Sequence, residues 1–421
     1  MRPSLPQLQG LLTVADRTLL EATRAQAEVH GLDLWLVGGA VRDLALARPV
    51  HDLDLATRGD AGALATAVAT RLNASVPGAA TVEHETRFGT TMLRFGAARL
   101  DLARLRCERY ARPGALPEVT FVDAIEEDLG RRDFTVNAMA LGVAGAQANV
   151  LVDPLGGLRD LDARRLRVLH PRSFIDDATR LWRGARTAAV FDLRPDAETA
   201  RLIAGGTRWL DTISGERIMA EIAFTAQRGR SGRTLALAEE WGVLHGTHPA
   251  LRLDASTGRA LRHRPGAIPV EIFVALLLAP IAHREAILRR LAASRALGTA
   301  ARDAARLLAA GRHVAGAGTP RRATPDEVAP LESTGTAART AARWLDPAAQ
   351  GALQRDLVRW GRTRPLLTPE ALVRLGVPRG PALGRTLDML RRARYLGTLE
   401  TAAEARREVR RTIAARGGAA S

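Results

Sequence analysis

The sequence predicts a small mixed α/β domain followed by a long region made only of helices. Between residues 32 and 106, short apolar stretches of strand length alternate with segments of helical periodicity. From Asp153 onward strand signals nearly vanish, and helical segments rich in Ala, Leu and Arg follow one another to the end. The chain has 421 residues and 46% hydrophobic content, enough for roughly two to four domains.

The elements of the α/β region can be assigned in order from the amino terminus. Helical periodicity over residues 11–31 predicts a first helix that ends at a glycine. The remaining elements are a strand (32–39), a short helix (40–47), a strand (51–57), a helix (60–75) and a β-hairpin (89–95 with 98–106). This order predicts a small sheet covered by helices.

Composition shifts divide the chain into four predicted domains. Gly and Pro cluster without an apolar period over residues 315–330, which is typical of a linker. The predicted domains are a head (1–150), a helical neck (151–225), a helical body (226–320) and a helical tail (321–421). The most apolar stretch, residues 272–282, is too short to span a bilayer and predicts a buried helix.

The charge of the chain indicates a polyanionic partner. The formal net charge is +16, the isoelectric point is about 11.4, and every basic residue is an arginine. GC-rich codon usage accounts for arginine in place of lysine, but not for the excess of basic over acidic residues. RNA or DNA is favoured over an acidic membrane. Cys107 is the only cysteine and no signal peptide is evident, so we expect a cytoplasmic protein.

Two aspartates stand one residue apart in the second predicted strand. Asp52 and Asp54 share one face of that strand, whereas Leu53 and Leu55 face the opposite way, toward a core. Neighbouring carboxylates repel each other, and a bound divalent cation such as Mg²⁺, which prefers oxygen ligands, compensates for that repulsion. The alternative interpretation is an exposed acidic strand end beside a tight turn.

A Gly-Gly-x-x-Arg-Asp pattern precedes the two aspartates. Gly38 and Gly39 allow backbone amides to approach an anion, and Arg42 adds positive charge at the start of a helix. This pattern favours the metal interpretation.

Asp101 lies on the polar face of the predicted hairpin. It is either a third ligand or general base, or a solvated surface residue.

Several longer motifs follow one another along the chain. They are LVGGAVRDLALARPVHDLDLAT, RFGTT with LDLARLRCERY, EEDLGRRDFTVNAMAL, DPLGGLRDL, RVLHPRSFIDDATRLWRGAR and ISGERIMAEI, with a tail element at residues 367–399. In this order they resemble the class II tRNA nucleotidyltransferases and bacterial poly(A) polymerases of the polymerase-β nucleotidyltransferase superfamily. The resemblance covers nearly the whole chain and is most specific over residues 35–221.

The resemblance implies a reaction and a set of site residues. The 3′-hydroxyl of tRNA would attack the α-phosphate of ATP or CTP and release pyrophosphate. Two Mg²⁺ ions on Asp52 and Asp54 would assist this step. Gly38, Gly39 and Arg42 would hold the triphosphate, with Arg132 as a further nucleotide contact. Asp101 falls where the family often has another acidic residue.

One further motif, DDATRLWRGAR, contains a row of charged residues at steps of three. On a helix this row would be an ordinary surface ion pair with solvated arginines. The resemblance implies instead that Asp177 and Arg180 read the incoming base. Arg183 and Arg186 would then support either the phosphates or the Asp177–Arg180 pair. The first acid of the motif is Asp176, where the family pattern has Glu.

Neighbouring motifs carry residues to which we give structural roles. Asp133 and Asn137 could bond backbone at a helix start. Glu216 and Arg217 are predicted to form a positioning ion pair, and Ser214 to cap a helix. The acceptor arm of tRNA is the predicted partner of the helical tail.

Alternatives within the family stay open. The main prediction is addition of C, C and A from CTP and ATP. An A-adding enzyme, a CC-adding enzyme or a poly(A) polymerase would share the motifs. The stretch 107–130 is close to full family length, which disfavours CC addition alone, whereas YARPGALPEV departs from the common loop sequence and leaves A addition open. A non-catalytic RNA-binding protein is the distant alternative.

Overall fold

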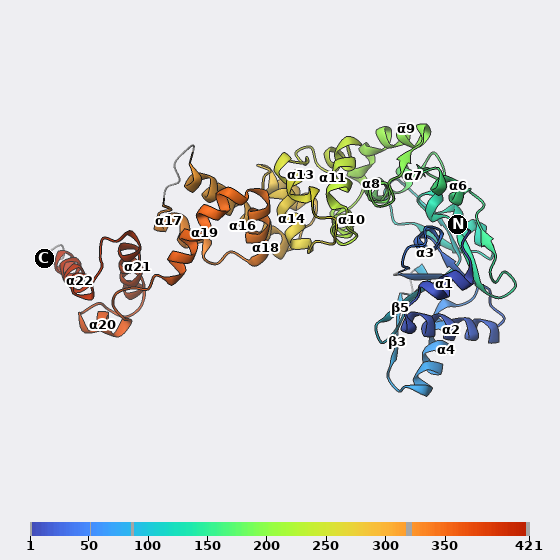
Figure 1. Ribbon diagram of the computed structural model, residues 1–421, viewed down its shortest axis with the longest axis horizontal. Coiled ribbons are helices and arrows are strands. Elements are labelled where there is room, and N and C mark those ends of the chain that lie inside the picture. Colours follow the sequence, from blue (N-terminus) through green and yellow to red (C-terminus); the bar gives the residue numbers. More distant parts are fainter. Residues whose placement is uncertain (1, 51, 86–87, 317–321, 418–421) are drawn as a thin grey trace. The chain divides into compact units, whose positions relative to one another are not determined.

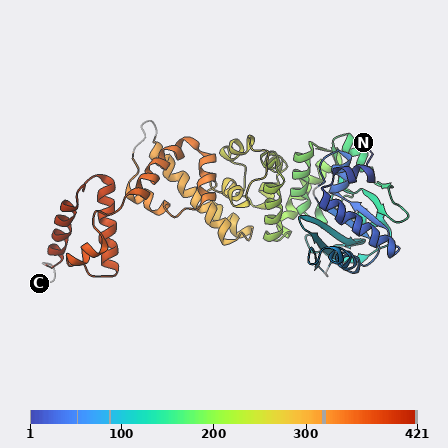
Figure 2. The same cartoon turned by 60° about the horizontal axis from the view of Figure 1, so that its bottom comes forward.

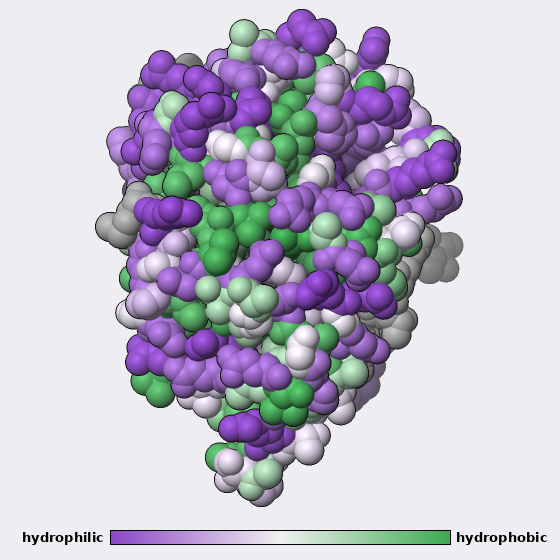
Figure 3. All heavy atoms as spheres, turned by 90° about the vertical axis from the view of Figure 1, so that its right-hand side faces the viewer, coloured by the Kyte–Doolittle hydropathy of each residue, from purple (hydrophilic) through white to green (hydrophobic). Residues whose placement is uncertain are grey.

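The computed structural model describes residues 2–50, 52–85, 88–316 and 322–417 (Figures 1 and 2). The chain forms two compact units, residues 1–251 and 252–421. Hydrophilic side chains cover most of the face seen in Figure 3, with hydrophobic residues in small groups between them. Within the described residues, every helix is too short or too polar to cross a membrane.

The first unit contains a seven-stranded mixed sheet. Its spatial order is β3-β4-β5-β2-β1-β8-β9. The strands are β1 (Leu34–Val37), β2 (Leu53–Thr57), β3 (Ala80–Glu85), β4 (Thr90–Phe95), β5 (Ala98–Arg104), β8 (Ala140–Ala144) and β9 (Leu151–Val152). β2 and β5 pair in parallel, and the other described pairs in this sheet are antiparallel. The predicted hairpin is therefore β4 with β5.

The core of this unit fixes which way the aspartates face. Helices α2 (Val14–Val29) and α4 (Ala61–Ser75) pack on one face of the sheet. Leu53 and Leu55 are buried in the same apolar cluster as residues of those helices. Because strand side chains alternate, Asp54 emerges on the opposite face, close to the turn that precedes α3 (Gly39–Ala45), with which it lines a cleft. The predicted orientation of Asp54 is confirmed.

Helices and short strands complete the first unit. They are α1 (Leu5–Leu11), α5 (Ile125–Gly130), α6 (Gly157–Asp162), α7 (Ser173–Asp176), α8 (Thr179–Phe191), α9 (Ala197–Gly206), α10 (Gly215–Gln227), α11 (Ser231–Glu240) and α12 (Val243–Thr247), with a ribbon of β6 (Arg106–Arg109) and β7 (Glu118–Phe121). After residue 153 the described strands are the two-residue pieces β10 (Arg165–Leu166) and β11 (Arg194–Pro195). Helix α8 packs against α10 and α11.

The second unit is helical throughout its described residues. Its helices are α13 (Ala255–Arg262), α14 (Val270–Leu278), α15 (Arg284–Arg290), α16 (Arg295–Ala315), α17 (Pro325–Val328), α18 (Thr336–Leu345), α19 (Pro347–Arg362), α20 (Pro369–Arg374), α21 (Pro381–Leu396) and α22 (Ala402–Gly417). α14, α16, α18 and α19 pack together, and α14 is buried from Phe273 to Leu278 as predicted. A separate apolar cluster, which includes Leu372, Leu390 and Val409, joins α20, α21 and α22.

Two local predictions need correction. The single helix expected over residues 11–31 is broken, because α1 ends at Leu11 and Thr13 caps α2 by accepting a hydrogen bond from the Asp16 amide. The linker expected over 315–330 contains α17, whose start is closed by a capping box of Thr324 and Glu327.

Parts of the predicted elements lie outside the described residues, namely His51, Arg87 and residues 317–321. The four-domain division remains a prediction.

Candidate active site

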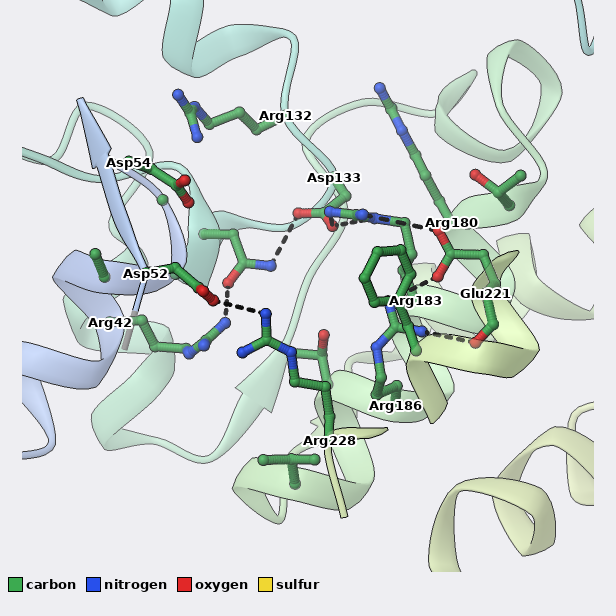
Figure 4. A pocket seen from close by; sticks show the side chains of 18 of the residues that line it. Arg42, Asp52, Asp54, Arg132, Asp133, Arg180, Arg183, Arg186, Glu221 and Arg228 are labelled. Carbon is green, nitrogen blue, oxygen red and sulfur yellow. Dashed lines mark hydrogen bonds and ion pairs between the residues drawn. The ribbon is translucent and has the colours of Figure 1, made fainter. Parts of the chain in front are cut away.

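A cleft of about 1130 Å³ opens in the first unit beside the carboxylates (Figure 4). One wall comes from the turn before α3 and from β2, and the other from α8 and α10. The cleft is lined by ten of the predicted site residues: Gly38, Gly39, Arg42, Asp52, Asp54, Arg132, Asp177, Arg180, Arg183 and Arg186. Segments more than a hundred residues apart in sequence thus meet at one place.

The carboxylates of β2 repel one another at the head wall of the cleft. Asp54 is half-buried and pairs in register with Asp101 on β5, whereas Asp52 is exposed just before the strand. Burial, followed by repulsion from Asp101 and Asp52, raises the pKa of Asp54 to about 6. A bound cation would relieve this repulsion. Groups of three or more metal-ligating side chains are absent from the described residues.

Asp101 is turned to a different partner. Its carboxylate accepts two hydrogen bonds from Arg99, from Nε at 3.2 Å and from Nη2 at 2.7 Å. It is not among the residues that line the cleft. A catalytic role for Asp101 therefore stays a prediction, and the geometry supports only an electrostatic influence on Asp54.

The glycine turn brings two guanidinium groups close to the backbone. Gly38 has φ of +70°, which glycine adopts without strain. A Cβ at Gly38 would stand 2.7 Å from Nη1 of Arg132, and one at Gly39 would stand 3.3 Å from Nη2 of Arg42. Nη2 of Arg132 donates to Asp128 at 2.8 Å, while its buried Nε makes no hydrogen bond. Arg132 thus places its Nη1 beside the turn.

Arg42 is held rigidly by its neighbours. Its Nη1 donates to Asn137 Oδ1 at 2.5 Å, and its Nη2 contacts Asp43 at 2.9 Å. The guanidinium also stacks over the ring of Phe191, 3.8 Å from the centroid. Arg42 therefore lies at the predicted anion site in a fixed orientation.

A buried aspartate connects the head to the neck helices. Asp133 is 5% exposed and accepts hydrogen bonds from Asn137 Nδ2 at 2.9 Å and from Arg183 Nε at 2.8 Å. Burial raises the pKa of Asp133, but the charge of Arg183 and the bond from Asn137 outweigh it and hold that pKa well below its usual range. Asp133 also accepts a hydrogen bond from the Phe134 backbone amide at 2.8 Å, so the backbone bond predicted for Asp133 is confirmed, whereas the Asn137 side chain bonds Asp133 and Arg42 instead (Figure 4).

The two outer arginines of the base-reading motif form ion pairs. Arg183 is 3.9 Å from Glu221, and Arg186 contacts the same carboxylate at 2.7 Å. Their roles toward phosphates stay predictions, because carboxylates already hold both guanidinium groups. Glu221 was not predicted. It lies four residues after Arg217 on α10, so helical spacing within the ISGERIMAEI motif was the available signal.

Asp177 and Arg180 lie at the neck wall of the cleft, but not on one helical face. Asp177 precedes α8, so the predicted row at steps of three does not begin on the helix. Its Oδ1 accepts from Thr179 and, at 2.9 Å, from Arg217. Arg180 is buried and donates to Ser173 Oγ and to the Arg131 carbonyl.

The ion pair predicted between Glu216 and Arg217 is wrong. Arg217 pairs with Asp177 and donates to the Gly114 carbonyl at 3.0 Å, because its side chain points into the cleft. Ser214 caps α10 as predicted.

Arg228, at the end of α10, was not predicted at all and contacts Asp52 at 2.6 Å. These two residues are 176 positions apart, so no local signal marks the contact.

Comparison with known proteins agrees with this architecture. A family model described as the poly A polymerase head domain matches residues 34–167. A CC-adding tRNA nucleotidyltransferase of Deinococcus radiodurans is 32% identical over 416 residues, which is 98% of this chain and 98% of that protein. An A-adding tRNA nucleotidyltransferase of Halalkalibacterium halodurans is 41% identical over 209 residues, 48% of this chain and 47% of that protein. This chain matches 25% and 28% of the length of two other A-adding relatives.

Solved structures share the fold. An apo form of a CCA-adding enzyme has a TM-score of 0.75 and 23% identity, covering 96% of this chain and 98% of that one. The Thermotoga maritima CCA-adding enzyme complexed with tRNA has a TM-score of 0.69 and 23% identity, covering 98% of this chain and 99% of that one.

A mixed sheet bearing paired carboxylates, followed by helices, defines the nucleotidyltransferase class of fold predicted from the sequence. With a relative matched over nearly the full length of both chains, this chain belongs to the family of tRNA nucleotidyltransferases and poly(A) polymerases. The predicted fold class and the predicted family are both confirmed.

Replacing Asp54 with Asn should stabilise the protein in the absence of divalent cations. The folded-state pKa of about 6 lies above the ordinary value of 3.8, so ionised Asp54 destabilises the fold, increasingly as the pH rises through that window. At pH 7.5 in EDTA, Asp54→Asn should raise the free energy of unfolding by about 2 kcal/mol, and the gain should vanish below about pH 4. Urea unfolding measures this. The exposed Asp211→Asn is the control, and equal stability of Asp54→Asn and wild type at pH 7.5 would contradict the analysis.

Replacing Asp133 with Asn should have the opposite effect. The change removes the carboxylate of buried Asp133 from the partly exposed Arg183, which keeps Glu221 at 3.9 Å, and should cost about 1–2 kcal/mol of stability. Because the folded-state pKa of Asp133 is lowered, its contribution is present above the ordinary pKa and is lost as the pH falls toward the folded-state value. Urea unfolding at pH 7 and pH 3 should therefore show a smaller deficit at pH 3. Glu83→Gln, which removes an exposed ion pair with Arg94, should change stability by less than about 1 kcal/mol.

Proposed function

We propose that the protein is a template-independent tRNA nucleotidyltransferase that adds C, C and A to the 3′ end of tRNA from CTP and ATP. One observation carries this proposal. The paired carboxylates of β2 and the residues predicted to read the base line the same cleft. A nucleotide bound across that cleft would have its phosphates beside Asp52 and Asp54 and its base beside Asp177 and Arg180.

The head wall suits a divalent cation and a triphosphate. Asp52 and Asp54 supply two mutually repelling carboxylates, the donor set that Mg²⁺ takes when phosphate oxygens complete its coordination. Mg²⁺ held there would acidify the attacking 3′-hydroxyl and neutralise charge on the departing pyrophosphate. Arg132, whose Nη1 lies beside Gly38, and the fixed Arg42 bind the phosphates. Gly39 lets the turn approach them closely.

The neck wall suits recognition of a base without a nucleic-acid template. Asp177 offers carboxylate acceptors and Arg180 offers guanidinium donors, a combination that can pair with the polar edge of cytosine or adenine. Arg217 and Thr179 fix Asp177 from two sides. Arg183 and Arg186 act through their ion pairs with Asp133 and Glu221, which hold α8 in place beside the head.

The acidic 3′ end of tRNA fits the charge of the chain. The excess of arginine favours RNA phosphates along the neck, body and tail, with the acceptor arm reaching the cleft. A single cysteine fits a reducing cytoplasm.

A narrower nucleotide specificity is the second candidate function. The relative that matches this chain over 98% of both lengths is named as CC-adding, whereas other relatives matched over about half of this chain are named as A-adding. The segment between β6 and β7, residues 110–117, faces the neck through the Gly114 carbonyl bond to Arg217. Its presence favours the full CCA activity over CC addition.

An assay with separate nucleotides distinguishes these specificities. Purified protein is incubated with tRNA ending in the bare discriminator, in C, or in CC, with CTP alone, ATP alone or both. We expect CTP to extend the first two substrates and ATP to extend only the CC-ended tRNA. Extension by CTP alone would establish a CC-adding enzyme, and extension by ATP alone an A-adding one.

Asp52→Ala should reduce every rate by at least about 100-fold. If wild type, like Asp52→Ala, extends none of the three substrates, the non-catalytic RNA-binding alternative holds instead.

Replacing Asp177 with Ala should impair discrimination among bases more than the chemistry. Loss of one paired base contact costs about 1–3 kcal/mol of discrimination. We therefore expect incorporation of CTP relative to UTP to fall by about tenfold or more, measured as the ratio of kcat/KM values on the discriminator-ended tRNA. The exposed Asp211→Ala, outside the cleft, is the matched control. An unchanged CTP-to-UTP ratio in Asp177→Ala would remove Asp177 from base recognition.

A further inference from the structure

An arginine from the neck occupies one of the two carboxylates assigned to the cation. Nη2 of Arg228 donates to Oδ2 of Asp52 at 2.6 Å, and Figure 4 shows the guanidinium reaching across the cleft toward β2. Arg228 directly follows α10 and lines the cleft together with Asp52. This contact connects the end of a neck helix to the catalytic strand of the head.

The exposure of this pair differs from that of the other ion pairs between head and neck. The Arg228 side chain is 51% exposed and that of Asp52 is 52% exposed. Asp133, by contrast, is nearly buried where it meets Arg183. A solvated ion pair is weak and is easily exchanged for another partner, whereas a buried one is costly to break. The Arg228–Asp52 contact is therefore the one of these two that a ligand can displace.

A cation and Arg228 cannot both be accommodated at Asp52 without repulsion. Each is a positive charge that needs the same carboxylate oxygens, and the guanidinium would lie within a few ångströms of the bound ion. Asp43 lines the same cleft and feels the charge of Arg228, so another carboxylate lies nearby when a cation takes Asp52. Binding at the Asp52 carboxylate is thus a choice between the two cations.

We propose that Arg228 competes with the divalent cation for Asp52, so that cation loading releases the end of α10 from the head. This inference rests on the proposed function, because that function assigns the cation to Asp52 and Asp54. It adds a positioning residue, Arg228, which neutralises Asp52 before loading and leaves the carboxylate when the cation arrives. Cation binding at Asp52 would thereby free the end of α10, the neck helix that bears Arg217 and Glu221, from its contact with the head.

The test measures Mn²⁺ binding in the absence of nucleotide. The electron paramagnetic resonance signal of free Mn²⁺ reports how much of the ion stays unbound. Mn²⁺ bound elsewhere is subtracted with the double variant Asp52→Asn, Asp54→Asn. Since an exposed pair contributes at most about 1 kcal/mol, Arg228→Gln should bind Mn²⁺ about two- to fivefold more tightly than wild type. Arg228→Lys restores the charge and should return the affinity toward the wild-type value. Arg233→Gln, an exposed arginine of α11 outside the cleft, should leave it unchanged.

The outcomes separate this inference from the proposed function. Equal or weaker Mn²⁺ binding by Arg228→Gln would overturn the competition and leave the metal assignment intact. Absence of any binding that depends on Asp52 and Asp54 would overturn both. A thermal unfolding curve for Arg228→Gln that matches wild type in EDTA to within a few degrees would show that the variant is folded, as the exposure of Arg228 leads us to expect. If Arg233→Gln also binds Mn²⁺ more tightly than wild type, the lower net positive charge of the protein explains the gain in affinity. This result would also overturn the competition.

Discussion

The parallel pairing of β2 with β5 is the constraint on which the cleft depends. In this register Leu53 lies beside Leu100 and Leu55 beside Leu102, and all four are buried beneath the head helices. The same register places Asp54 beside Asp101 on the other face. The core therefore forces carboxylates together where they repel, and hydrophobic burial stabilises an arrangement that electrostatics alone would oppose. The repulsion between these carboxylates raises the pKa of Asp54, on the polar face of two interior strands.

A chain of polar contacts also connects the head to the neck. Asp43 and Asn137 hold Arg42, Asn137 bonds Asp133, and Asp133 meets Arg183. Each donor in this series has a definite acceptor, so directional bonds, together with the packing of Phe134 against α8, set the walls of the cleft relative to each other. A ligand that spans the cleft would therefore meet Arg42 on one wall and Arg183 on the other at a separation that these bonds set.

Local sequence patterns predicted the elements that carry the site, and distant contacts determined what the patterns left out. Alternation around Leu53 and Leu55 predicted the orientation of Asp54, because strand geometry is set by near neighbours. The pairing of Arg217 with Asp177, and of Arg228 with Asp52, joins segments 40 and 176 residues apart. Such pairs follow from how α10 packs beside the head, which no local period records. The break at Thr13 was missed for a different reason, since a capping side chain interrupted a helical period that otherwise continued.

The turn at Gly38 links two requirements in one residue. Its backbone adopts a conformation that disfavours every residue with a Cβ, and the space a Cβ would fill belongs to the Arg132 guanidinium. An alanine at this position would strain the main chain and evict the arginine together, so no second substitution at residue 132 alone repairs both faults. Because Nη1 of Arg132 is the flexible end of a long side chain and can shift, the left-handed backbone conformation is the stricter of the two constraints on residue 38.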